Sequence, residues 1–306
     1  MNEVKLIIPE NPSLDNRAMI DVSALGRKYL DVPYASIAPS QKLDLYLPDE
    51  GDGPFPLIVF IHGGAFIRGD KRDFQAMIII DALNRGFAIA SVEYRFAPET
   101  LFPYQLFDVK AAVRWLRAHA GEYYLDGDRF IAAGTSCGAY FAAMLAATNG
   151  AAQFEERSLG NPGVSSAVQG LMGFYGLYNL VRQSEYTQEQ GPLPGMDEVF
   201  NFADIFAGVS AREHPNLMYL ASPVNLVTGD MPPTLIQGGN PDGIVPYEDS
   251  VEMAEKIKTV CGAERIQFDT LDGAFHGDAA YGSPENQARI FAFLERNFLK
   301  GAEGRP

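Results

Sequence analysis

Short segments that are almost wholly apolar recur along the chain and alternate with segments that we predict to be helical. The run Pro56–Ile61 is continuously apolar, as expected for a β-strand covered on both faces. Further strands are predicted at Arg27–Ala35, Lys42–Leu47, Phe87–Tyr94, Arg129–Ala133, Val168–Phe174, Thr234–Gln237 and Arg265–Thr270. Helices are predicted at Phe74–Arg85, Asp108–His119, Gly138–Thr148, Tyr247–Thr259 and Pro284–Phe298. Because strands that alternate with helices form parallel sheets, the pattern predicts an α/β fold, with a mostly parallel central sheet flanked by helices.

The segment from Leu177 to about Pro223 departs from this alternation. It is richer in Gln, Glu, Gly and Pro, yet it carries large apolar residues, namely Met196, Phe200, Phe202, Phe206 and Met218. The alternative is a long solvated loop, but a loop of more than about forty residues without structure of its own is uncommon in a compact domain. We therefore predict a helical cap inserted at about 177–223. We expect Met196, Phe200, Phe202 and Phe206 to line a confined apolar pocket.

Composition bounds the number of domains and the classes of partner. With 306 residues and 47% hydrophobic content, the chain can bury a large core, and we predict one domain over residues 1–306. The formal net charge of -15 argues against nucleic acid or an anionic membrane as a partner, because both require clustered Lys and Arg. The oligomeric state is left open, and a homo-oligomer is compatible with the sequence.

The N-terminus and the two cysteines indicate where the protein resides and whether it binds a metal. Met1–Glu10 lacks the pattern of a secretory signal, and apolar runs such as Ala76–Ile80 are too short to span a bilayer. The two cysteines, Cys137 and Cys261, fit a reducing compartment and are too few and too isolated for a zinc site. We expect a cytoplasmic protein that uses no cofactor and no metal.

The stretch Phe130–Tyr140 runs from an apolar strand directly into a helix of small residues, with Ser136 and Cys137 at the junction. Gly134-Thr-Ser-Cys-Gly138 fits G-x-S-x-G, a tight strand-to-helix turn that displays the serine hydroxyl. Alone the pattern is weak, but the flanking strand and helix are the context that it requires. We predict that Ser136 is the nucleophile. A cysteine nucleophile would need its own base and an electropositive setting, and the sequence offers no second set of partners.

A serine hydroxyl needs a base to take its proton, and the chain has 4 histidines. These are His62 after a strand, His119 at a helix end, His214 in the cap segment, and His276 after the last predicted strand. The loops that follow parallel strands gather at one edge of the sheet. We therefore predict that His276 is the general base.

The base needs a carboxylate to fix its tautomer, and in α/β hydrolases the chain order is serine, acid, histidine. Asp242 satisfies that order and lies just past a predicted strand. Asp230, Asp269 and Asp272 are the competitors, and the alternative for each is a cap, strand-face or turn carboxylate. We predict that Asp242 is the catalytic acid.

Acyl transfer also needs backbone N–H groups aimed at the oxygen that becomes negative. The stretch His62-Gly-Gly-Ala-Phe66 matches the HGGG-type loop that supplies such donors; the alternative is a plain glycine-rich turn. The expected donors are the N–H groups of Gly64, Ala65 and Cys137. Alanine at position 65 departs from the all-glycine form, and a backbone donor survives there if φ stays negative. We expect His62 to anchor the loop rather than to catalyse.

Taken together, these motifs resemble the α/β-hydrolase superfamily and, within it, bacterial carboxylesterases related to the hormone-sensitive-lipase branch. The resemblance runs through most of the chain and rests on His62–Phe66, Glu93–Pro98, Phe102-Pro103, Asp108 with Ala111–Leu116, Gly134–Gly138 and Asp242–Pro246. Two departures are Ala65, and Gln237-Gly-Gly where relatives usually carry His-Gly-Asp. The resemblance implies that Tyr94-Arg95 structures the nearby loop without a catalytic role.

The working hypothesis is a serine carboxylesterase that hydrolyses short-chain or aromatic carboxylic esters through an acyl-enzyme intermediate. A carbohydrate acetyl or feruloyl esterase, or an amidase, uses the same machinery and differs only in pocket shape. A different class is a catalytically silent α/β-hydrolase that binds a small molecule. Such proteins typically lose the histidine or the nucleophile, whereas this chain carries both.

Overall fold

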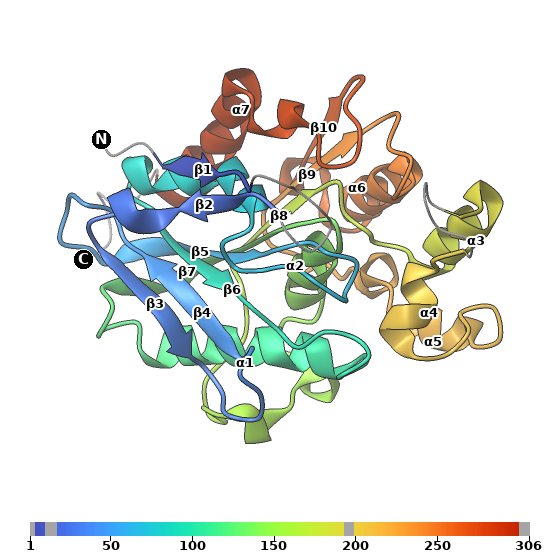
Figure 1. Ribbon diagram of the computed structural model, residues 1–306, viewed down its shortest axis with the longest axis horizontal. Helices are drawn as coiled ribbons and strands as arrows, with labels where there is room; N and C mark the ends of the chain where they lie inside the picture. Colours follow the sequence, from blue (N-terminus) through green and yellow to red (C-terminus); the bar gives the residue numbers. More distant parts are fainter. Residues whose placement is uncertain (1–3, 10–16, 193–198, 300–306) are drawn as a thin grey trace.

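The computed structural model describes residues 4–9, 17–192 and 199–299. Within these residues the main sheet is 8-stranded, in the order β10-β9-β8-β7-β5-β6-β4-β3 (Figure 1). The strands are β3 Lys28–Pro33, β4 Lys42–Tyr46, β5 Phe55–Ile61, β6 Ala88–Val92, β7 Leu125–Thr135, β8 Gly170–Phe174, β9 Thr234–Gly239 and β10 Ile266–Leu271. Parallel pairing runs from β6 through β5 to β10, and β4 is antiparallel to both β6 and β3. The predicted mostly parallel sheet is confirmed, and the fold is that of an α/β hydrolase.

Helices cover both faces of the sheet, as strand β5 shows most directly. Every residue of β5 is buried, and its side chains alternate between two apolar clusters because successive residues of a strand point to opposite faces. Leu57, Val59 and Ile61 belong to the cluster that includes side chains of α1 Tyr104–Ala118, α2 Cys137–Ala147 and α6 Tyr247–Cys261. Ile58 and Phe60 belong to the cluster that includes α7 Pro284–Leu294. This two-sided burial explains the continuous apolar run.

The structure corrects several predicted elements. The segment predicted as one helix at Phe74–Arg85 forms two 3₁₀ helices, η2 Phe74–Ile78 and η3 Ile80–Arg85, with the break at Ile79. Consecutive β-branched isoleucines disfavour a continuous α-helix because they lose side-chain freedom there. An antiparallel pair, β1 Lys5–Ile7 and β2 Met19–Asp21, was not predicted. The last predicted helix ends at Leu294 and continues as a π-helical turn, Glu295–Leu299.

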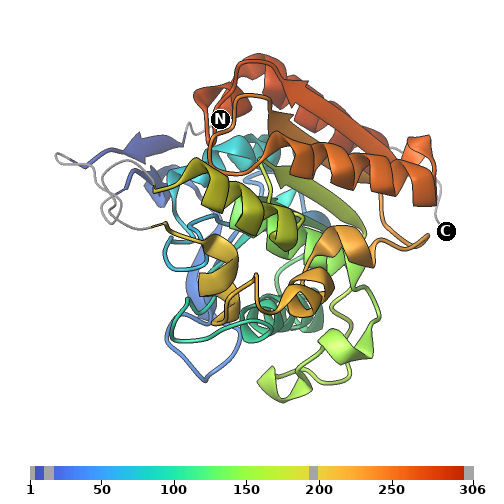
Figure 2. The same ribbon diagram turned by 90° about the vertical axis from the view of Figure 1, so that its right-hand side faces the viewer.

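Among the residues that the structure describes, three α-helices lie between β8 and β9, namely α3 Leu180–Gln190, α4 Phe202–Ala207 and α5 Pro215–Leu220. They gather at one side of the sheet in Figure 1, and Figure 2 turns that side toward the viewer. Asn179 caps α3 and Asn201 caps α4, each by accepting a backbone hydrogen bond with its side chain, as residues of this type do at helix starts. We propose that this segment, about 177–223, is a cap on a single domain.

The connections around β5 and β7 create the place where a site can form. The chain leaves β5 for its neighbour β6 on one side, whereas β7 is followed by β8 on the other side. In open α/β sheets a crevice forms at such a reversal, at the carboxyl ends of the strands. The loop after β5 begins at His62, and Ser136 directly follows β7, so both segments open into this crevice.

Candidate active site

Ser136 stands on a tight turn between β7 and α2, with φ 54 and ψ -124. A residue with a side chain reaches this region at a cost of about 1–3 kcal/mol, so the surrounding structure must enforce it. The flanking glycines permit the turn. A Cβ on Gly134 would lie 2.3 Å from the backbone of Gly138, and a Cβ on Gly138 would lie 2.0 Å from the Ile61 carbonyl oxygen. Both glycines of the motif are therefore required by backbone packing.

His276, in the loop after β10, joins Ser136 to Asp242, in the loop after β9. Ser136 Oγ lies 3.0 Å from His276 Nε2, and His276 Nδ1 lies 2.8 Å from Asp242 Oδ2. With Nδ1–H donating to the carboxylate, Nε2 is free to accept the serine proton. Asp242 is held in turn, because its Oδ1 accepts hydrogen bonds from the backbone N–H groups of Ile244 and Val245 at 2.9 and 3.0 Å. The structure thus brings the three predicted residues into one hydrogen-bonded chain.

Two of the competing acids have other partners. Asp269 accepts a hydrogen bond from Gln237 Nε2 at 3.0 Å, and Asp272 accepts one from Asn240 Nδ2 at 2.6 Å. Gln237 is buried and is also bonded to Asn286 on α7 at 2.8 Å. Gln237, which stands where relatives usually carry the histidine of His-Gly-Asp, therefore connects β9 to β10 and α7 and makes no contact with Asp242 through these bonds.

Cys137 turns its side chain inward. The thiol is 2% exposed, and its Sγ accepts a hydrogen bond from the backbone N–H of Phe66 at 3.4 Å. Burial raises the pKa of the thiol above its usual value, against the opposing effect of the backbone N–H groups of Phe66, Ala65 and Gly64. The sulfur is thus a neutral thiol at neutral pH and packs behind the loop, while Cys137 N begins α2 beside Ser136.

The loop after β5 has an unusual backbone. Gly64, Ala65 and Phe66 have φ of 134, 56 and 66, so the negative φ that the sequence analysis required for a donor at Ala65 is not found. A left-handed conformation at an alanine costs about 1–2 kcal/mol, and the loop is held at its start by Gly63, whose N–H donates to Gln75 Oε1 at 2.7 Å. The loop places the predicted donors Gly64 and Ala65 in the lining of the same pocket as Ser136.

His62 is placed as an anchor. Its ring is fully buried and stacks on Tyr94, with ring centroids 4.9 Å apart. Burial lowers the pKa of His62 to about 4, so the ring is neutral at neutral pH. It lies 2.8 Å through Nδ1 from the Gly63 carbonyl oxygen, which ties the ring to the start of the loop.

Tyr175 was missed by the sequence analysis. It follows β8 directly, has φ 40, and sets its ring against the edge of His276 with the centroids 4.8 Å apart. Its N–H donates to the Gln237 carbonyl oxygen at 2.8 Å. The available signal was its position at the carboxyl end of a central parallel strand, where loops collect. Tyr175 therefore limits how far the imidazole can turn.

The pocket in front of Ser136 is small and largely apolar. It has a volume of about 280 Å³, close to the lower end of the ~300–1,000 Å³ usual for ligand pockets. Phe200 and Phe202 contribute to its wall, together with Leu177 and Phe74. Phe206 was expected there too, but it is buried and stacks on Phe66 with centroids 4.1 Å apart. Met196, the fourth expected residue, lies outside the described residues.

The described residues provide neither a cluster of metal ligands nor a helix that could cross a membrane. Across residues 4–9, 17–192 and 199–299, no group of three or more His, Cys, Asp or Glu is arranged to hold a metal ion. No helix in the same ranges has the length and apolar character needed to cross a bilayer.

Comparison with known proteins identifies relatives of this chain. Residues 43–257 match the family model described as BD-FAE. Esterase LipC of Mycobacterium tuberculosis is 29% identical over 245 residues, which is 78% of this chain and 57% of the relative. A probable isoprenylcysteine alpha-carbonyl methylesterase of Arabidopsis thaliana is 25% identical over 244 residues, 78% of this chain and 49% of the relative. The chain thus spans about half the length of the curated relatives that it matches.

Solved structures show the same fold. A truncated form of a carbohydrate esterase from gut microbiota superposes with a TM-score of 0.77 at 26% identity, covering 90% of this chain and 98% of that chain. An esterase of Thermogutta terrifontis superposes with a TM-score of 0.68 at 22% identity, covering 89% of this chain and 94% of that chain. At that identity the second likeness concerns the fold alone.

Proposed function

Because this chain belongs to the BD-FAE family, we propose that it is a carboxylic ester hydrolase, a serine esterase that acts on short-chain or aromatic carboxylic esters. The observation that carries the proposal is the hydrogen-bonded chain from Ser136 through His276 to Asp242, at distances of 3.0 and 2.8 Å. The relatives named as esterases support the general reaction. The small apolar pocket supports the finer choice of substrate.

In the proposed mechanism His276 Nε2 takes the proton of Ser136 as its Oγ attacks the ester carbonyl carbon. Asp242 holds the imidazole in the required tautomer and stabilises the imidazolium that forms. The carbonyl oxygen becomes negative and is stabilised by the N–H groups of Gly64, Ala65 and Cys137. His276 then protonates the leaving alcohol, and water, activated by the same imidazole, cleaves the acyl-enzyme.

A carbohydrate acetyl or feruloyl esterase is the second candidate, and one observation favours it. The solved structure that is 26% identical to this chain is that of a carbohydrate esterase. Amidase activity needs the same residues. A panel of 4-nitrophenyl esters, acetylated xylosides, methyl ferulate and simple anilides separates these substrates by kcat/KM. Binding of esters without turnover would instead indicate a silent binding protein.

The proposal is tested by substitution and by active-site labelling. Ser136→Ala and His276→Ala should each lower kcat/KM for 4-nitrophenyl acetate by several orders of magnitude. Ser158→Ala, which removes an exposed serine outside the pocket lining, is the matched control and should retain full activity. A fluorophosphonate probe should add its mass at Ser136. Labelling at another residue, or a Ser136→Ala enzyme with more than about a hundredth of the wild-type rate, would contradict the assignment.

A further inference from the structure

The pocket in front of Ser136 is lined in part by basic residues that ester hydrolysis does not require. Its described lining includes Arg17 and Arg68 and no aspartate or glutamate. The chain as a whole has the opposite balance, with 24 Lys and Arg against 39 Asp and Glu. The lining of this pocket therefore lacks the carboxylates that predominate in the chain, whereas a second hollow that both arginines also line includes Asp70 and Asp73.

Arg17 is already neutralised. Its guanidinium lies 2.8 Å from Asp73, whose side chain is 2% exposed, and it lies 5.3 Å from the centre of the Phe74 ring. A guanidinium with a buried carboxylate on one side and an aromatic face on another has its main interactions satisfied. Arg17 thus contributes shape to the pocket and little free charge.

Arg68 is different, because it forms no hydrogen bond or ion pair through its side chain with any residue that the structure describes. Its backbone is fixed. The Gly64 carbonyl oxygen accepts hydrogen bonds from the N–H groups of Ile67 and Arg68, at 3.1 and 3.2 Å. A Cβ at Gly64 would lie 1.9 Å from the Arg68 carbonyl oxygen. This turn folds the chain back on itself and keeps Arg68 next to the proposed oxyanion donors.

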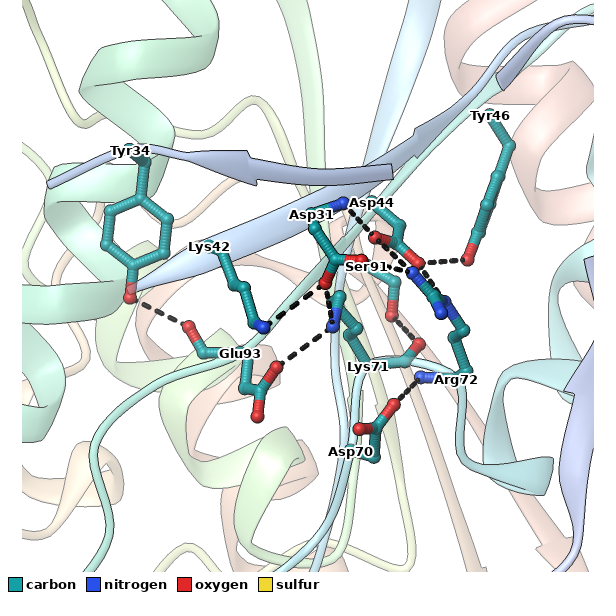
Figure 3. A network of polar contacts seen from close by, with 10 residues as sticks. All are labelled: Asp31, Tyr34, Lys42, Asp44, Tyr46, Asp70, Lys71, Arg72, Ser91 and Glu93. Carbon is teal, nitrogen blue, oxygen red and sulfur yellow. Dashed lines mark hydrogen bonds and ion pairs between the residues drawn. The ribbon is translucent and has the colours of Figure 1, made fainter. Parts of the chain in front are cut away.

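The next two basic residues after Arg68, Lys71 and Arg72, both have acidic partners (Figure 3). Lys71 Nζ lies 3.0 Å from Asp31 and 3.1 Å from Glu93. These contacts tie the end of the loop to β3 and to the end of β6, so that the segment carrying Arg68 is held at both ends.

Arg72 completes this anchoring. Its Nε lies 2.5 Å from Asp44 Oδ2, and Asp44 is fully buried on β4. Its Nη2 lies 3.0 Å from Asp31 (Figure 3). Within the basic stretch 68–72, the one guanidinium or ammonium group left without a carboxylate is therefore that of Arg68, in the part of the chain that the structure describes.

We propose that Arg68 binds a carboxylate of the substrate, so that the preferred substrates are esters that carry a free acid group. This inference rests on the esterase function proposed above. A guanidinium presents two parallel N–H donors that match a carboxylate. Apolar walls such as Phe74 and Leu177 strengthen the attraction by lowering the local dielectric constant. The acid can belong to the acyl part, as in a monoester of a dicarboxylic acid, or to the alcohol part, as in an acetylated hydroxy acid.

The test uses two pairs of esters that differ in charge but hardly in size. Mono-4-nitrophenyl adipate is compared with 4-nitrophenyl hexanoate for the acyl part, and 4-acetoxybenzoate with 4-acetoxybenzamide for the alcohol part. For each pair the measured quantity is the ratio of kcat/KM for the anionic ester to kcat/KM for the neutral ester. Differences in intrinsic reactivity cancel when this ratio is compared between wild type and variant.

Arg68→Gln should lower the ratio at least about tenfold in one of the two pairs, mainly through KM of the anionic ester. Arg68→Lys should restore part of the loss, because the ammonium keeps the charge without the paired donors. Arg212→Gln is the matched control. Arg212 is exposed, lies outside the pocket lining and has the same charge, so this variant should leave both ratios unchanged.

The pair that responds identifies which part of the ester carries the acid. The inference is overturned if Arg68→Gln changes neither ratio by more than about twofold. An equal loss on charged and neutral esters would also overturn it, because Arg68 would then support the oxyanion rather than the substrate acid. Failure of the wild type to hydrolyse any of the four esters would instead overturn the proposed function, and the inference with it.

Discussion

Cys137 is the residue next to the proposed nucleophile, and its role can be separated from that of Ser136. Its thiol is buried and accepts a hydrogen bond from Phe66 N–H, while only its backbone N–H is assigned to the oxyanion. Cys137→Ala should therefore keep kcat/KM for 4-nitrophenyl acetate within about tenfold of wild type, since loss of a true oxyanion donor costs a hundredfold or more. Cys137→Ser, which keeps an acceptor for Phe66, should lose less.

One outcome would contradict the assignment of Ser136 as the nucleophile. A folded Cys137→Ala protein without activity, beside a Ser136→Ala protein that still turns over, would make the thiol the nucleophile. Circular dichroism and thermal unfolding establish that each variant is folded. Alkylation of the native enzyme should be slow, because burial raises the pKa of the Cys137 thiol and the thiolate is the reactive species.

His62 gives a prediction about pH and stability. Burial lowers its pKa from 6.5 to about 4, so the unfolded chain binds a proton at His62 more readily than the folded protein does. The stability that the neutral ring contributes is complete above pH 6.5 and is lost as the pH falls toward 4, up to about 3 kcal/mol. Nuclear magnetic resonance should find no titration of the His62 ring above about pH 5.

Two buried acids act in the opposite direction, so a comparison is needed to isolate His62. Burial raises the pKa of Asp73 to about 6 and that of Asp249 to about 7. Each therefore adds stability as the pH falls through the range between its unfolded and folded values. The difference in urea unfolding free energy between wild type and His62→Asn removes their effect. If this difference is the same at pH 7.5 and pH 5, the buried neutral histidine is ruled out.

Residues of the site differ in how readily the sequence predicts them. The apolar pattern locates the strands that precede Ser136, Asp242 and His276. Their meeting at one edge of the sheet could therefore be predicted. The positive φ of Ala65 and the contact of Tyr175 with His276 could not. Both arise from packing between segments far apart in sequence, which no local pattern records.

At the scale of elements, the segment between β8 and β9 sets the size of the pocket. Phe200 and Phe202 line it and meet edge to face, with ring centroids 5.4 Å apart. We expect activity on 4-nitrophenyl esters to peak at short acyl chains. Phe200→Ala should raise kcat/KM for the octanoate relative to the butyrate by about fivefold or more, because each accommodated methylene contributes binding energy.

A control for that variant lies on α5. Tyr219 is 55% exposed and is absent from the pocket lining, so Tyr219→Ala should leave the chain-length profile unchanged. A wild-type optimum at twelve carbons or longer, with activation at a lipid interface, would indicate a lipase and contradict the confined pocket. The measurement is a series of initial rates across acyl lengths for the three proteins.

Element type was harder to predict where local preference and packing compete. The segment 74–85 is largely apolar and packs against the sheet. It forms two 3₁₀ helices rather than one α-helix because its consecutive isoleucines disfavour the α-helical conformation. The hairpin of β1 and β2 escaped prediction because β1 is exposed along its length and so carries no inward-facing pattern. Strands buried on both faces, such as β5, were the most predictable.

At the scale of the whole molecule, the proposed catalytic residues follow strands that differ in their number of neighbours in the sheet. Ser136 follows β7, which pairs with β5 on one side and β8 on the other, near the middle of the sheet. His276 follows β10, which ends the sheet and pairs with β9 alone among the described strands. Most β10 side chains are only partly buried, whereas β7 is buried where it approaches Ser136.

Because β10 lies at the edge of the sheet, we expect denaturant to abolish activity before it unfolds the rest of the protein. Edge strands with little buried apolar area open in local fluctuations before the core does, and an opening of β10 carries His276 away from Ser136. In a urea titration, hydrolysis should therefore fail at a lower concentration than the fluorescence of the single tryptophan, Trp115, which belongs to α1 and reports on the opposite half of the sheet. Coincident midpoints would mean that the whole sheet melts as one cooperative unit.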